Sequence, residues 1–220
     1  MVCGNAAGVL APPYVNYKAE KIWSTWTENG PPDTRYNRTK SGWFDSNSFE
    51  DWFVSLMLPI LKKQEGPKVI IGDNLSSHIN IEVIKQCEMN NIKFIALPPN
   101  ATHLLQPLDV AFFRPMKVAW RKILKDWKET AAGSRCTSVP KDQFPNLLNS
   151  LWGAMIKGPD NLIAGFRKSG IYPINREPVL KRLPSGSLDA SISSIVGESF
   201  LEQITMKRQE ATQEYRERKS

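Results

Sequence analysis

The fold of this chain is decided by KVIIGDN at residues 68–74 and by IKFIALPPNATHLLQPLD at residues 92–109. Each stretch begins with a short apolar run, which predicts buried strands at 68–72 and 92–97. The first strand is apolar on both faces, so we expect it to be central in its sheet. Residues 79–90 between the strands have apolar residues at helical spacing. This order predicts a parallel strand pair joined by a right-handed crossover helix.

Each predicted strand leads to an acidic residue. Asp73 directly follows the first strand, where side chains reach the crevice beyond the sheet. Asp109 lies in the first turn of a helix predicted from about 106 to 129, on the same face as Phe113 and Trp120, so we expect it to point toward the sheet. Two carboxylates that meet repel each other unless a cation lies between them. The pair therefore predicts a divalent metal site; the alternative is that both residues are ordinary helix caps.

The rest of the chain contributes helices and connections. Apolar spacing predicts helices at 46–64, 144–156 and 160–168, the first capped by Asp45 or Ser46. Residues 2–18 suggest a hairpin entered halfway, and residues 19–45 a long connection held by aromatic residues. Pro115 must kink the helix at 106–129 or separate its first turn. From residue 185 the composition shifts to Ser, Gly and Ala, which predicts a mobile tail with one charged helix.

The charge balance favours a polyanionic partner. The chain has 29 Lys and Arg against 22 Asp and Glu, a net charge of +7. Five basic residues recur at three- and four-residue steps along the helix at 106–129: Arg114, Lys117, Arg121, Lys125 and Lys128. This basic stripe can follow a DNA backbone, and equally it can be a solvated outer helix face. His103 can contact a phosphate, although a loop histidine that hydrogen-bonds its neighbours is the commoner case.

Other composition features exclude several classes of protein. No apolar run approaches the roughly 18 residues that a membrane span needs, so we expect no membrane partner. The three cysteines, Cys3, Cys87 and Cys136, have no metal-binding spacing and leave an odd one out, which favours reduced thiols. No glycine-rich phosphate loop or Ser/His/Asp pattern is present.

Several motifs, taken in order, resemble the catalytic domain of pogo/Tigger-type transposases, in the Tc1/mariner group, which includes the domesticated jerky and centromere protein B relatives. The resemblance covers about residues 1–176. It is carried by these segments: NAAG with PPYVNYK (5–18), SGWFDSNSFEDWF (41–53), GDNLSSH (72–78), IKFIALPPNATHLLQPLDVAFFRPMK (92–117) and GFRKSGIYPIN (165–175).

The resemblance implies an α/β ribonuclease-H-like fold, a mixed sheet flanked by helices. It also implies a DDE-type endonuclease that uses three acids and two Mg²⁺ or Mn²⁺ ions to cleave DNA, and a location in the nucleus. The family's second and third acids match Asp73 and Asp109, with 35 residues between them. The stripe and His103 are then candidates for nucleic-acid contacts.

One part of the family pattern is absent from this chain. The family's first acid lies on a strand before the early hairpin, but here no acid precedes Glu20. We therefore expect residues 1–176 to form a ribonuclease-H-like domain that lacks its first strand, and residues 177–220 to form a linker and a helical, charged extension. The expected function is DNA binding by a truncated, transposon-derived domain that is catalytically incomplete.

Two alternatives stay open. The first is an active, metal-dependent DNA endonuclease or transposase whose beginning is missing from this chain. The second is a non-enzymatic interaction module, in which surface tryptophans and amphipathic helices bind a protein partner or a second copy of the chain.

Overall fold

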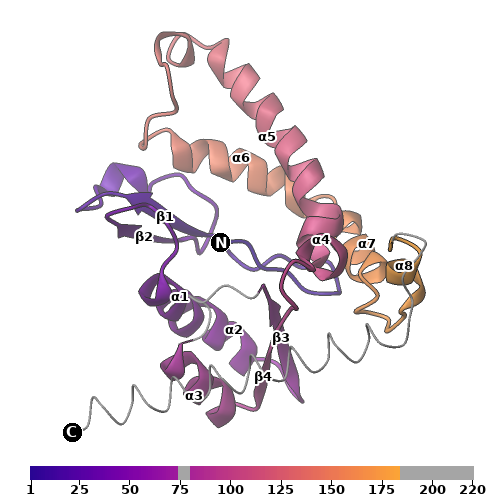
Figure 1. Cartoon of the computed structure of the whole chain (residues 1–220). Helices are drawn as coiled ribbons and strands as arrows, with labels where there is room; N and C mark the ends of the chain where they lie inside the picture. The colour runs from indigo at the N-terminus through magenta and orange to yellow at the C-terminus, as the bar shows by residue number, and fades with distance from the viewer. Residues whose placement is uncertain (74–79, 184–220) are drawn as a thin grey trace, which may run out of the picture. The chain divides into compact units, whose positions relative to one another are not determined.

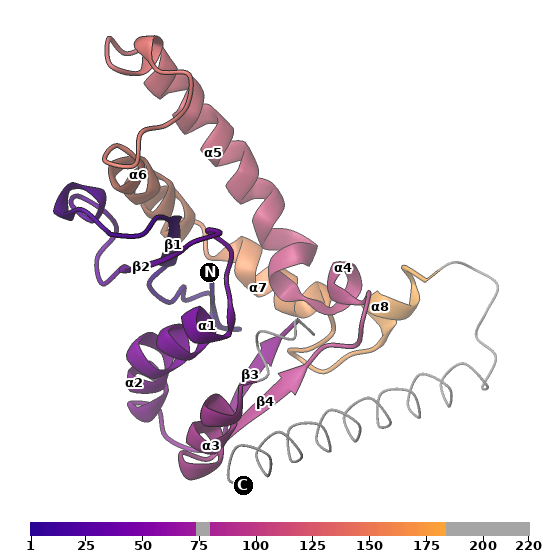
Figure 2. The same ribbon diagram turned by 60° about the vertical axis from the view of Figure 1, so that its left-hand side comes forward.

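The computed structural model describes residues 1–73 and 80–183, and Figures 1 and 2 show the chain from two sides. The chain divides into two compact units, Met1–Val179 and Leu180–Ser220. The first unit has mixed α/β structure with small sheets and helices, which confirms the α/β class; the ribonuclease-H-like fold stays a prediction. The predicted charged helix near the C-terminus lies outside the described residues. No helix among the described residues is both long and apolar enough to cross a membrane.

The strand–helix–strand unit predicted from the opening motifs is confirmed. Strand β3 (Lys68–Gly72) and strand β4 (Ile92–Ala96) pair in parallel, and helix α3 (Ile81–Met89) connects them. The Asn80 side chain caps α3 by accepting hydrogen bonds from the backbone N–H groups of Glu82 and Val83. The strand pair continues by one hydrogen bond, from the Leu97 N–H to the Gly72 carbonyl (2.8 Å).

The prediction that the first strand is central in its sheet is wrong for the described residues. There β3 pairs only with β4, and the side chain of Val69 is 50% exposed. Successive side chains of a strand point to opposite faces. Ile70 is therefore buried in the core, while Val69 and Ile95 of β4 are accessible to solvent.

A second strand pair joins the segment predicted as a hairpin to the region predicted as a long connection. Strand β1 (Tyr14–Lys18) pairs in parallel with strand β2 (Arg35–Thr39). The sequence of β2, Arg-Tyr-Asn-Arg-Thr, lacks an apolar run, so the sequence analysis did not predict this strand. The short 3-10 helix η1 (Ser24–Trp26) lies between them. The expected early hairpin is reduced to a single antiparallel bridge between Gly4 and Leu10.

The helix predicted at 46–64 is confirmed, with a π-helical segment in its middle. Helix α1 (Ser46–Trp52) continues through η2 (Phe53–Met57) into helix α2 (Leu58–Lys62). The Asp45 carboxylate caps α1 by accepting the Ser48 N–H at 2.8 Å. The buried face of this run forms one core cluster with residues of β1, β3, α3 and β4: Tyr14, Phe49, Trp52, Phe53, Leu56, Met57, Leu58, Leu61, Ile70, Val83, Cys87 and Ile92.

The helix predicted at 106–129 is divided into two parts, the π-helical segment η4 (Leu108–Phe112) and helix α5 (Phe113–Lys128). The short helix α4 (Thr102–Leu105) precedes them. Pro115 lies just after the change from π-helical to α-helical backbone, and residues 107–128 stay helical without a break. The expectation that Pro115 kinks this helix or separates its first turn stays a prediction.

The C-terminal helices of the first unit form around a second core cluster. Helix α6 (Phe144–Ile156) and helix α7 (Asp160–Lys168) have the predicted bounds, and the 3-10 helix η5 (Gly133–Arg135) precedes them. Figures 1 and 2 show α5 and α6 side by side, and α7 packs against η4. Helix α8 (Glu177–Leu180) ends the described elements. The buried members of the cluster are Phe112, Leu148, Leu151, Met155 and Leu162.

Candidate functional site

Asp73 lies at the carboxyl end of β3, as predicted. The residue is half-buried, and it lines a narrow cavity of about 120 Å³. The walls of this cavity come from the N-terminal segment at residues 1–4, from β3 itself and from Gln106 and Pro107 ahead of η4. The strand end therefore places Asp73 beside the segment that leads to Asp109. His78, which the sequence also places near Asp73, lies outside the described residues.

Asp109 is the second residue of η4 and lies in a different setting from the one predicted. Its side chain is exposed, and it lines a cavity of about 400 Å³ together with Phe113 and with three residues of the basic stripe: Arg114, Lys117 and Arg121. Asp109 shares this cavity with Phe113, as its predicted helix face implies, but its side chain is exposed instead of buried against the sheet. A π-helical turn bonds residue i to residue i+5 instead of i+4, which rotates Asp109 relative to α5.

The two acids are near enough to influence each other's charge. The pKa of the Asp109 carboxyl is raised above its ordinary value, first by partial removal of water at the cavity wall and then by the negative charge of Asp73. Lys117 acts in the opposite direction and lowers the pKa of Asp109. The fold thus brings together the two carboxylates that the sequence singled out and adds a lysine beside them.

The donor set of this pair fits a single hard divalent cation. Mg²⁺ prefers oxygen ligands and is commonly held by one or two carboxylates, with water and phosphate oxygens completing its shell. Asp73 and Asp109 supply such carboxylates from two different elements. The described residues contain no cluster of three or more His, Cys, Asp or Glu that could hold a metal. Glu20, the first acid of the chain, lines a different cavity.

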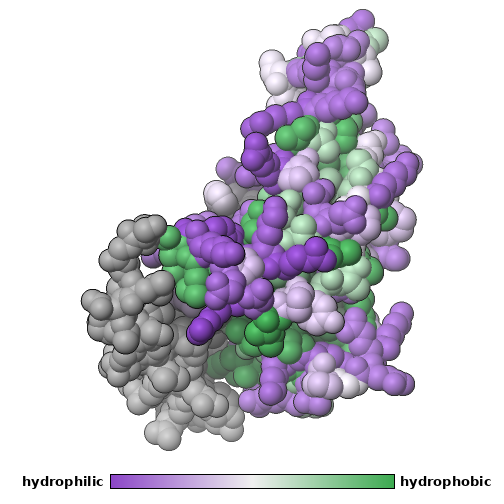
Figure 3. All heavy atoms as spheres, turned by 90° about the vertical axis from the view of Figure 1, so that its right-hand side faces the viewer, coloured by the Kyte–Doolittle hydropathy of each residue, from purple (hydrophilic) through white to green (hydrophobic). Residues whose placement is uncertain are grey.

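All five residues of the basic stripe are exposed along α5. On the face of the molecule drawn in Figure 3, hydrophilic residues alternate with hydrophobic ones. Arg114, Lys117 and Arg121 share a cavity with Asp109, so the stripe begins at the acid. Lys125 is exposed farther along the helix. Lys128 differs from the others because its amino group donates to the Cys136 carbonyl and lies 5.5 Å from the centre of the Trp127 ring.

His103 lies on α4, between β4 and η4, and is exposed. It does not line the cavity of either acid. His103 is therefore at the surface, and it is close to the acidic pair only in the sequence. Its contact with a phosphate stays a prediction.

Two residues near the acids were missed by the sequence analysis. Gln106 lines the same cavity as Asp73, and an amide there adds a neutral oxygen and two N–H donors to the site. Gly165 of α7 lies directly against the Pro107 carbonyl group, where a Cβ atom would overlap the backbone. The glycine in the GFRKSGIYPIN motif was the available signal for this close approach.

Comparisons with known proteins bear on the same region. A family model described as DDE superfamily endonuclease matches residues 1–151, which include both acids and most of the described helices. The protein named MFS-type transporter clz9 from Cochliobolus lunatus is 26% identical over 181 residues. That match covers 81% of this chain but only 19% of the fungal protein, so the chain spans about a fifth of that relative. No solved structure matches the chain significantly.

Proposed function

Since this chain belongs to the DDE superfamily endonuclease family, we propose that it is a transposase-derived domain of the pogo/Tigger type that binds DNA and lacks a complete catalytic centre. The observation that carries the proposal is that Asp109 shares a cavity with three cations of the basic stripe and is near enough to Asp73 for that charge to raise the pKa of Asp109. Acids that hold a metal and cations that hold phosphates are the two parts that a DNA-cleaving site needs. The ordered motifs support the pogo/Tigger subtype and a ribonuclease-H-like fold.

In this proposal the residues of the site have distinct roles. Asp73 and Asp109 hold one Mg²⁺ or Mn²⁺ ion, and His103 is a further candidate for a phosphate contact. A bound ion of this kind polarises a phosphodiester oxygen and favours ionisation of a water molecule. Arg114, Lys117 and Arg121 bind backbone phosphates next to the pair, and Lys125 extends the track along α5.

Catalytic incompleteness follows from the number of acids. A two-metal centre needs a third carboxylate that contacts both ions, and no third acid joins the pair among the described residues. We therefore expect the 220-residue protein to bind DNA without nicking it in Mg²⁺ or Mn²⁺. Robust nicking that is lost in Asp73→Ala and Asp109→Ala variants would overturn this part of the proposal and favour an active endonuclease. Because DNA binding is the proposed role, we also expect the chain to act in the nucleus.

The DNA-binding part is tested with a triple variant of the stripe. We expect Arg114→Ala, Lys117→Ala and Arg121→Ala together to weaken duplex binding and to reduce the slope of log Kd against log salt by about one unit per residue removed. Fluorescence anisotropy on a labelled duplex between about 50 and 250 mM salt, where the Debye length falls from about 14 Å to about 6 Å, measures both quantities.

A matched control removes the same charge elsewhere. Lys62, Lys63 and Lys157 are exposed, lie off the stripe and can be replaced by Ala in one protein. If that control loses as much affinity as the stripe variant, only net charge matters and the stripe is not the DNA track. If the wild-type protein binds no DNA at low salt, an interaction module becomes the better account.

A further inference from the structure

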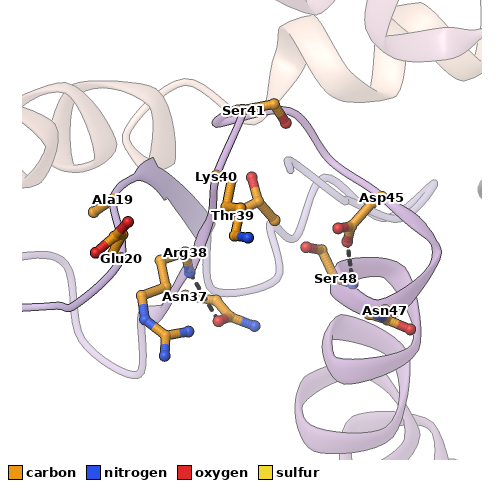
Figure 4. Close-up of a pocket in the computed structure, with 10 residues that line it drawn as sticks. All are labelled: Ala19, Glu20, Asn37, Arg38, Thr39, Lys40, Ser41, Asp45, Asn47 and Ser48. Carbon is orange, nitrogen blue, oxygen red and sulfur yellow. Dashed lines mark hydrogen bonds between the residues drawn. The ribbon is translucent and has the colours of Figure 1, made fainter.

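A third cavity, of about 710 Å³, is lined by other residues than the acidic pair, and Figure 4 shows its lining residues. It is formed by the two residues that follow β1, by β2 with the turn that follows it, and by the start of α1. Its lining is polar and includes four charged residues: Glu20, Arg38, Lys40 and Asp45. None of these residues has a role in the site described above.

The two basic side chains of this cavity can bind a ligand, whereas one of its acidic side chains already accepts a hydrogen bond within the protein. Arg38 and Lys40 are exposed, and neither forms an ion pair within the described part of the chain. The Asp45 carboxylate accepts the Ser48 N–H, and its hydrogen bonds with Ser48 lower the pKa of Asp45. Glu20 is exposed on the same side as Arg38 (Figure 4). A ligand with negative charge therefore meets its attractive groups at Arg38 and Lys40.

An exposed tryptophan stands in the loop that borders this cavity. Trp43 lies between Ser41 and Asp45, which both line the cavity, and its side chain is 80% exposed. The backbone that carries it is nevertheless fixed: the Trp43 carbonyl accepts hydrogen bonds from Asn16 (2.8 Å) and from the Thr39 hydroxyl (3.0 Å). The Trp43 N–H donates to the Ser41 hydroxyl at 3.1 Å. The exposed indole is therefore carried by a loop whose backbone is held by hydrogen bonds.

An exposed indole on a fixed loop that borders a cavity with two unpaired cations suits one class of ligand. The faces of bases in a duplex are covered by their neighbours, so an indole stacks only on an unpaired or terminal base. Phosphates that flank such a base can reach cations next to the ring. We propose that Trp43 is a stacking platform for an unpaired base of a nucleic acid, and that Arg38 and Lys40 bind the adjacent phosphates. This inference rests on the proposed DNA-binding function and extends it to single-stranded segments.

The test compares a blunt duplex with the same duplex carrying a single-stranded extension that contains 2-aminopurine. We expect the wild-type protein to bind the extended DNA more tightly and to quench the 2-aminopurine by stacking. Trp43→Ala should raise the Kd for the extended DNA about tenfold, within the range for base stacking on an aromatic side chain. It should change blunt-duplex binding much less, because only the end base pairs of that duplex have an open face. Trp43→Phe should restore most of the difference, and Arg38→Ala with Lys40→Ala should weaken binding of the extension.

Trp23→Ala is the matched control, because Trp23 is also exposed (65%) but does not line or border the cavity. Circular dichroism and the Tm of each variant check that the fold is kept. Equal binding of both DNAs by the wild type, or an extension preference that survives in Trp43→Ala, would overturn the inference and leave the proposed function standing. A wild-type protein that binds neither DNA would overturn both.

Discussion

Gly165 of α7 is in contact with the main-chain carbonyl of Pro107, two residues before Asp109. A methyl group on Gly165 would overlap the Pro107 oxygen, so the helix can approach η4 this closely only without a side chain. Gly165 is buried, as is Pro107. The position of Asp109 therefore depends on a residue 56 positions later in the chain, through a backbone-to-backbone contact.

Replacing Gly165 by Ala tests this contact. We expect a loss of about 1–3 kcal/mol of unfolding free energy, because the overpacked backbone of η4 must shift. The measurement is urea unfolding followed by circular dichroism. Gly153→Ala is the control, because Gly153 is also inside a helix but a Cβ there meets no atom within 4 Å. That control should be neutral or slightly stabilising, since Ala favours a helix over Gly. Equal losses in both variants would show that the contact with Pro107 is unimportant.

A divalent cation should stabilise the folded protein through the acidic pair. Like charges on Asp73 and Asp109 oppose each other, and an ion bound only in the folded state raises its stability by mass action. At about ten times its Kd, Mn²⁺ should raise the Tm by about 3–6 °C. Differential scanning fluorimetry measures the shift. It should vanish in Asp73→Asn and in Asp109→Asn but persist in Asp142→Asn, which removes an exposed acid elsewhere. A shift that survives in both pair variants would exclude the predicted metal site.

The polar network around Asp51 links β1, β2 and α1 and gives the fold a pH dependence. The Asp51 carboxylate accepts hydrogen bonds from Tyr14 (2.7 Å), from Asn37 (3.2 Å) and from two nitrogens of Arg35 (2.6 and 3.1 Å). Partial burial alone would raise the pKa of Asp51, but these hydrogen bonds outweigh it and hold the pKa below its ordinary value. The charged carboxylate is thus favoured in the folded state.

The sign of the pH effect follows from that lowered pKa. The stabilisation by Asp51 is present above the pKa of the unfolded state, about 3.9, and is lost as the pH falls through the lower folded value. We expect Asp51→Asn to cost about 1–2 kcal/mol at pH 7, since a charge-assisted hydrogen bond is lost and Arg35 is half-exposed. The cost should shrink toward pH 3 in urea unfolding. A cost that stays constant with pH, as for the exposed control Asp126→Asn, would contradict this role.

Local sequence signals predicted the elements that carry the acids but not the way in which they pack. The apolar runs at 68–72 and 92–97 and the spacing at 144–156 identified β3, β4 and α6, because burial of one face imposes that pattern. Strand β2 has no such pattern, and its Asn37 contributes a hydrogen bond instead of an apolar contact. The π-helical turn at η4 has no distinct spacing of apolar residues, so the sequence analysis did not predict the exposure of Asp109.

We expect Lys128, the last residue of the basic stripe, to contribute to the stability of the fold and not to DNA binding. Lys128 is spaced like the other cations, but its amino group donates to the Cys136 carbonyl and lies over the Trp127 ring. The lysine thereby ties the end of α5 to the loop around η5, whereas Arg121 lines the Asp109 cavity. Removing each side chain in turn separates the two roles.

We expect Lys128→Ala to lower the unfolding free energy by about 1 kcal/mol, through the lost hydrogen bond and ring contact, and to change duplex affinity little. Arg121→Ala should do the reverse: the Kd for a duplex rises and the salt slope falls by about one unit, with stability nearly unchanged. Urea unfolding and anisotropy titrations on the same two proteins give the comparison. If Lys128→Ala reduced the salt slope as much as Arg121→Ala, the lysine would have to leave the Cys136 carbonyl for a phosphate, and the stripe would extend over the whole length of α5.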